Sequence, residues 1–66
     1  MQVTVNGEVR ETAPDATVQT LLASLGIDSR KVAVERNRAI VPKSAYDRTP
    51  LRPDDALEIV QFVGGG

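Results

Sequence analysis

Residues 17–26 read TVQTLLASLG, and this stretch decides how the rest of the chain must be arranged. Thr17 is a favourable N-cap, because its hydroxyl can accept a hydrogen bond from a backbone N–H of the first turn. Apolar side chains then follow at the i, i+3, i+4 and i+7 positions of one helical stripe: Val18, Leu21, Leu22 and Leu25. Gly26 stands where a residue with positive φ ends a helix. We therefore predict one amphipathic helix whose apolar stripe must be covered.

The segments before this helix predict a β-hairpin. Residues 1–6 alternate between apolar and polar side chains, which is the period of a half-buried strand. Asn6-Gly7 is a strong signal for a two-residue hairpin turn. Residues 8–12 then form the returning strand, with Val9 as its one clear inward residue.

The segments after the helix predict three more strands, at 32–36, at 39–41 and from 56 or 57 to 63. Pro42 ends the middle one, because proline cannot donate to a ladder. The order of elements predicts an α+β domain over residues 1–63, in which one face of a sheet is covered by the helix.

Two connecting segments are expected to lack regular structure. Residues 43–53 should be irregular, with Tyr46 and Leu51 anchoring them to the core. Residues 52–55 form a turn cluster, in which Asp54 and Asp55 are expected to be solvated rather than to converge on a substrate.

The composition excludes most catalytic chemistry. The 66 residues make one small domain with no Cys and no His, which removes disulfides, a thiol nucleophile and the usual metal ligands, so no metal site is expected. The net charge of −1 is scattered, and no long apolar run is present, so we expect neither nucleic acid nor a membrane as partner. A cytoplasmic carrier or binding protein fits better than an enzyme.

The tail Gly64-Gly65-Gly66 leaves the terminal carboxylate as a candidate reactive group. Glycine has no Cβ and can thread a narrow channel in another protein's active site. A carboxylate becomes electrophilic only when activated, usually by adenylation with ATP, so a partner would have to supply the catalyst. The alternative is that residues 64–66 are a flexible loose end.

The last strand predicts a contact surface beside this tail. Placing Leu57 and Ile59 in the core keeps Glu58 in water and sends Val60 and Phe62 to the open face of the sheet. Exposed apolar neighbours often mark a partner surface. The alternative is that Phe62 only seals an edge of the sheet.

These features together resemble the ubiquitin-like β-grasp sulfur carriers, and most closely the ThiS-type carriers of thiamine biosynthesis. The resemblance covers the whole chain. It lies in the opening strand with Asn6-Gly7, then TVQTLL (17–22), VAVERN (32–37), IVPKS (40–44), DDALEIV (54–60) and FVGGG (62–66).

The resemblance implies a β-grasp fold, with a mixed sheet of about four to five strands packed on one helix. It also implies that a ThiF-like adenylyltransferase uses ATP to activate Gly66, and that a sulfur donor protein converts it to a thiocarboxylate. Thiazole synthase (ThiG-like) would then take the sulfur for the thiazole ring. Gly64 and Gly65 would provide reach, and Val60 and Phe62 would contact the partners.

Three alternatives share this shape. A carrier for molybdopterin synthesis would differ only in its partner, and a ubiquitin-like modifier would be joined to lysines through the same terminus. A TGS-like module that binds a ligand or RNA would not need a terminal glycine.

Overall fold

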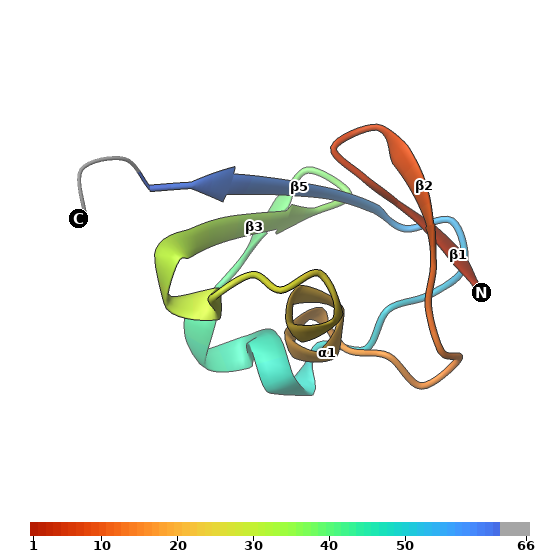
Figure 1. The fold of residues 1–66 in the computed structure, drawn as a ribbon, viewed down its shortest axis with the longest axis horizontal. Coiled ribbons are helices and arrows are strands. Elements are labelled where there is room, and N and C mark those ends of the chain that lie inside the picture. The colour runs from red at the N-terminus through yellow and green to blue at the C-terminus, as the bar shows by residue number, and fades with distance from the viewer. Residues whose placement is uncertain (63–66) are drawn as a thin grey trace.

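The computed structural model describes residues 1–62. In chain order its elements are β1 (Gln2–Val5), β2 (Glu8–Glu11), α1 (Val18–Ser24), η1 (Ser29–Lys31), β3 (Val32–Arg36), β4 (Ala39–Val41), η2 (Lys43–Arg48) and β5 (Ala56–Gln61), where η denotes a short 3₁₀ helix. The strands form one sheet in the order β2-β1-β5-β3-β4, in which β5 is parallel to β1 and the other neighbours are antiparallel (Figure 1). The prediction of a mixed sheet with one main helix is confirmed.

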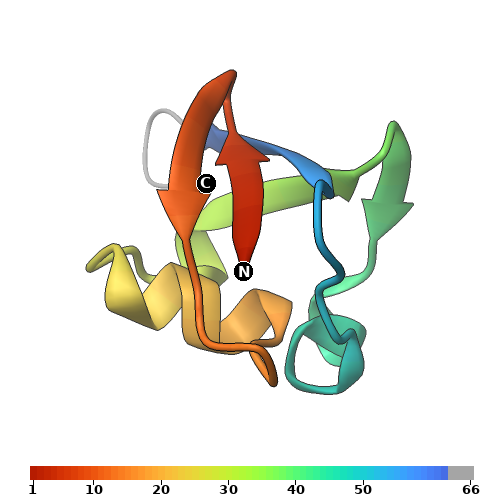
Figure 2. The ribbon, with the colours of Figure 1, turned by 90° about the vertical axis from the view of Figure 1, so that its right-hand side faces the viewer.

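The core lies between the sheet and α1, which covers one of the two sheet faces (Figure 2). We call the opposite face the open face. The buried apolar side chains come from the strands, from α1 and from the segments around η2: Val3, Val5, Ala16, Val18, Leu21, Leu22, Val32, Val34, Val41, Tyr46, Leu51 and Leu57.

Helix α1 forms as its sequence predicts. The Thr17 hydroxyl accepts from the backbone N–H of Thr20, and the Thr20 hydroxyl accepts from the backbone N–H of Thr17, which completes a capping box. Leu25 is the C-cap, and Gly26 follows with a φ of +71°. Within the described part of the chain, no helix has the length and apolar character to cross a bilayer.

The hairpin between β1 and β2 forms at Asn6-Gly7, where both residues have positive φ. Its register places Val9 opposite Thr4, on the face away from the core residues Val3 and Val5. Val9 is therefore 63 % exposed, and the prediction that it points inward is wrong. A two-residue turn fixes this register, and the turn alone assigns Val9 to the open face.

The segment after β4 is more regular than predicted, because residues 43–48 form η2. The two predicted anchors are correct, since Tyr46 and Leu51 are both buried. The Tyr46 hydroxyl donates to the Val32 carbonyl at 3.1 Å, which satisfies its one polar atom inside the core.

The turn before β5 contradicts the prediction of two solvated carboxylates. Asp54 is exposed, but Asp55 is only 6 % exposed. The Asp55 carboxylate accepts from the backbone N–H of Arg52 at 2.8 Å and from the side-chain amide of Asn37 at 3.0 Å, and it lies 3.5 Å from the Arg36 guanidinium. It therefore ties the β3–β4 turn to the start of β5.

These contacts change the acidity of Asp55. Burial raises its pKa, but the hydrogen bonds from Arg52 and Asn37 and the Arg36 charge together hold the pKa below its usual value. Because the folded-state pKa lies below the unfolded-state pKa of about 4, the resulting stability is present above about pH 4. It is lost as the pH falls through the folded-state pKa.

We expect Asp55→Asn to lower the free energy of unfolding at pH 7 by about 1–3 kcal/mol, because buried donors lose a charged acceptor. Denaturant unfolding at pH 7 and near pH 3 measures this loss, which should shrink at the lower pH. Asp54→Asn is the matched control, because Asp54 is exposed and has a positive φ that Asn tolerates. Equal losses for the two variants would contradict the assignment.

Candidate functional site at the end of β5

The predicted reactive residue Gly66 and the tail residues Gly64 and Gly65 lie outside the described residues, as does Val63. The described part of the site is the end of β5 and the side chains around it. Strand β5 ends at Gln61, two residues before the predicted end.

Strand β5 is hydrogen-bonded on both edges close to its end. Its antiparallel pairing with β3 reaches Gln61 opposite Val32, and the Phe62 N–H donates to the Lys31 carbonyl at 2.9 Å. On the other edge the parallel pairing with β1 covers only two residues, and the Asn6 side chain continues it. The Asn6 amide accepts from the Ile59 N–H at 2.8 Å and donates to the Ile59 carbonyl at 3.2 Å. Phe62 therefore follows a strand that is held on both sides.

The alternation along β5 agrees with the sequence prediction. Leu57 is buried and Ile59 is half-buried, whereas Val60 is 61 % and Phe62 46 % exposed. Ile40 on β4 is also exposed, and the register with β3 places it on the same open face as Val60. The exposure of Val60 and Phe62 is confirmed, and their role as partner contacts stays a prediction.

One face of the Phe62 ring is in contact with a cation. The Lys43 ammonium lies 4.8 Å from the ring centroid and donates to the Arg30 carbonyl at 2.7 Å. The ring is thus neither fully exposed nor sealed against the sheet edge. The sequence shows no signal for this contact, because Lys43 lies 19 positions before Phe62 and outside any strand pattern.

The turn that carries Arg30 is held by Asp28. The Asp28 carboxylate caps η1 by accepting from the Arg30 N–H at 2.9 Å, and it also accepts from the Arg30 guanidinium at 3.1 Å and 3.0 Å. These hydrogen bonds and the Arg30 charge lower the pKa of Asp28 to about 2. At neutral pH the carboxylate is therefore ionised and available to hold η1.

Two carboxylates face each other on the open face. Glu35 on β3 is directly opposite Glu58 on β5, and both side chains are exposed. Among the described residues, no basic group lies within 4.0 Å of either carboxylate. Like charges directly opposite in a ladder are destabilising, so this pair does not serve the stability of the fold.

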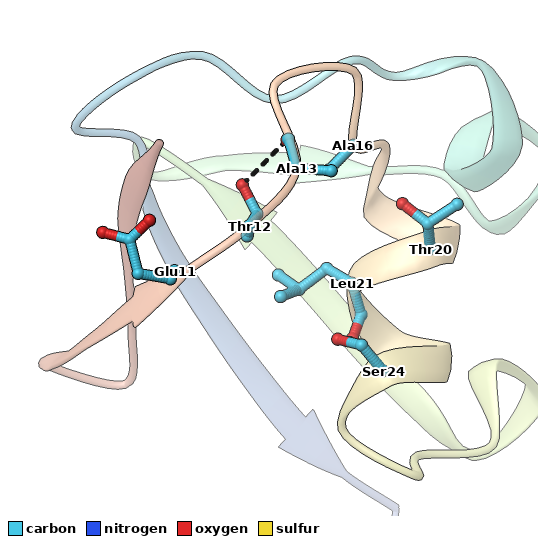
Figure 3. Close-up of a pocket in the computed structure, with 7 residues that line it drawn as sticks. All are labelled: Glu11, Thr12, Ala13, Ala16, Thr20, Leu21 and Ser24. Carbon is cyan, nitrogen blue, oxygen red and sulfur yellow. Dashed lines mark hydrogen bonds between the residues drawn. The ribbon is translucent and has the colours of Figure 1, made fainter.

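A shallow hollow lies away from β5, between α1 and the loop that precedes it. Its volume is about 280 Å³, and it is lined by Glu11, Thr12, Ala13, Ala16, Thr20, Leu21 and Ser24 (Figure 3). Glu11 is the titratable member of this lining, and its carboxylate points away from the helix. The hollow therefore does not assemble an acid and a base.

We expect Glu58→Gln to raise the free energy of unfolding by roughly 0.2–1 kcal/mol at low ionic strength, because it removes the repulsion from Glu35. Denaturant unfolding at low and high salt measures the gain, which screening should reduce. Glu8→Gln is the control, since Glu8 lies 3.6 Å from Arg10 on the edge strand β2. The interpretation fails if Glu8→Gln stabilises the chain as much as Glu58→Gln.

Comparisons with known proteins agree with this geometry. The model of the ThiS family matches residues 3–66. The sulfur carrier protein ThiS of Bacillus subtilis is 43 % identical over 63 residues, which cover 94 % of this chain and 96 % of that protein. The crystal structure of the thiamine biosynthesis protein ThiS from Geobacter metallireducens is 35 % identical, with a TM-score of 0.85 and full coverage of both chains.

A longer relative also matches. The thiazole synthase of Paramagnetospirillum magneticum is 54 % identical over all 66 residues, and the chain spans only 20 % of that protein's length. The family match over nearly the whole sequence and the structural likeness confirm the β-grasp fold and the resemblance seen in the sequence. The chain belongs to the ThiS family.

Proposed function

We propose that the chain is a sulfur carrier of thiamine biosynthesis, acted on by partner enzymes rather than catalysing a reaction itself. The observation that carries this proposal is the 43 % identity to a ThiS sulfur carrier over 96 % of that protein's length. The shared sequence is therefore nearly the whole of a carrier protein.

The reactive group in this proposal is the carboxylate of Gly66. One of its oxygens attacks the α-phosphorus of ATP on a ThiF-like adenylyltransferase, which forms an acyl-adenylate and releases pyrophosphate. A persulfide on a donor protein then attacks the carbonyl carbon, and AMP leaves to give an acyl disulfide. A thiol reductant cleaves the S–S bond of this disulfide, which releases the donor as its thiol and leaves a thiocarboxylate on Gly66. Cys and His are absent from the chain, which supports a partner as the source of the acid–base and thiol chemistry.

Thiazole synthase is the proposed acceptor of the sulfur. In the Paramagnetospirillum magneticum protein, a segment similar to this chain belongs to the same polypeptide as the rest of a thiazole synthase. Joining a carrier to the enzyme that uses its cargo raises their effective concentration. This arrangement supports the view that the separate proteins also meet.

The described structure supports the proposal through the way it holds β5. Hydrogen bonds hold the strand as far as Ile59 on the edge toward β1 and as far as Phe62 on the edge toward β3. The folded body can therefore dock while three glycines reach into an active site. Val60 and Phe62 are the proposed contacts for docking.

The central test is the intact mass of the 66-residue protein after incubation with ATP, a ThiF-like adenylyltransferase and a sulfur source. We expect a gain equal to the replacement of one oxygen by one sulfur. A variant that lacks Gly66 should show no gain, because its terminal carboxylate would belong to Gly65 and would lie one residue short of the active site of the partner. An unchanged mass of the complete chain with a partner of proven activity would overturn the proposal.

The docking contacts are tested by Val60→Ser and Phe62→Ser. We expect each to raise the KM of the adenylyltransferase for the carrier about five- to thirtyfold, as loss of a central apolar contact does. Val9→Ser is the matched control, because Val9 is 63 % exposed and Val60 is 61 % exposed, but Val9 lies on the edge strand β2. Wild-type kinetics for Phe62→Ser would show that the contact surface lies elsewhere.

A further inference from the structure

We infer that Lys43 is a positioning residue: its ammonium group holds the Phe62 ring in one orientation, ready for the partner proteins that act on the tail. This inference rests on the proposed function, because it assigns Phe62 a partner. It adds a residue from outside β5 and the glycines to the site.

The position of the Lys43 ammonium is set by two contacts. Lysine has a flexible side chain, and an ammonium group is strongly hydrated when nothing else binds it. Here it donates to the Arg30 carbonyl at 2.7 Å, and it lies 4.8 Å from the centroid of the Phe62 ring. The second distance is within the range of about 6 Å in which a cation is attracted to the face of an aromatic ring.

The backbone N–H and the aromatic ring of Phe62 are both held, directly or through Lys43, by η1. Its backbone N–H donates to the Lys31 carbonyl in η1, and its ring is in contact with the ammonium that η1 holds through Arg30. Asp28 in turn caps η1 and binds the Arg30 guanidinium. These contacts therefore fix the orientation of the Phe62 ring relative to its backbone.

This arrangement brings little to the stability of the fold. Lys43 is exposed, and Phe62 remains 46 % exposed, so their contact removes little apolar surface from water. What the contact does change is the number of orientations open to an exposed ring. A ring already held in one orientation loses less entropy when a partner covers it, so binding becomes more favourable.

The test uses Lys43→Met, which keeps the length of the side chain and removes its charge, and Lys43→Arg, which keeps a cation that stacks on aromatic rings. The steady-state KM and kcat of a ThiF-like adenylyltransferase are measured with each carrier as substrate. For Lys43→Met we expect the KM to rise about two- to fivefold with kcat unchanged, as loss of an exposed cation–π contact implies. Lys43→Arg should restore most of the wild-type KM.

Lys31→Met is the matched control, because it also removes one lysine charge near Phe62 but keeps both the Lys31 backbone carbonyl that accepts from Phe62 and the Lys43 ammonium over the ring. We expect its KM to equal that of the wild type. An equal rise for Lys31→Met and Lys43→Met would mean that net charge decides the KM, and this would overturn the inference. A wild-type KM for Lys43→Met would overturn it as well.

A second measurement does not depend on any partner. In the proton NMR spectrum of the wild-type chain, the ring current of Phe62 should shift the Lys43 ε-methylene signal upfield, and Phe62→Leu should abolish the shift. An unshifted Lys43 signal would overturn the inference even if sulfur transfer is normal. A shifted signal in a carrier that no adenylyltransferase accepts would instead overturn the proposed function, and with it the role of this contact in partner binding.

Discussion

Strand β5 lies in the middle of the sheet, and the rest of the structure depends on its being hydrogen-bonded on both edges. Its neighbours are β1, from the start of the chain, and β3, from the middle. The sheet is therefore incomplete until the last strand is in place, and the N-terminal hairpin has no link to β3 without it. Such long-range pairing makes the domain a single cooperative unit.

The two ends of β5 are stabilised by different means. At its start, the buried Asp55 gathers donors from three other positions of the chain, and the fold gains from that network. Beyond Leu57, exposed side chains dominate: Glu58 lies opposite Glu35, and after the end of the strand the Phe62 ring is in contact with Lys43. The first arrangement serves folding. The second arrangement contributes little to the stability of the fold, which is typical of a surface that binds other proteins.

Much of the fold could be predicted from the sequence because the signals are local. The stripe from Val18 to Leu25 and the positive φ of Gly7 depend only on neighbouring residues. The exposure of Val60 and Phe62 followed from the alternation of β5. The site was predicted less completely, since Lys43 and Asn6 belong to it through contacts that no periodicity describes. The residues between 63 and 66 carry the proposed chemistry, which rests on the sequence and on the family.

The sequence by itself determined the helix, the hairpin turn, the strand alternation and the glycine tail, because each depends on the order of adjacent residues. Tertiary structure decided the burial of Asp55, the side-chain hydrogen bonds of Asn6, and the cation that lies over the Phe62 ring. The partners in these contacts come from separate elements, such as Asn37 for Asp55, 18 positions away, and Ile59 for Asn6, 53 positions away. Contacts at such separations arise only when the whole sheet assembles, so local patterns carry no trace of them.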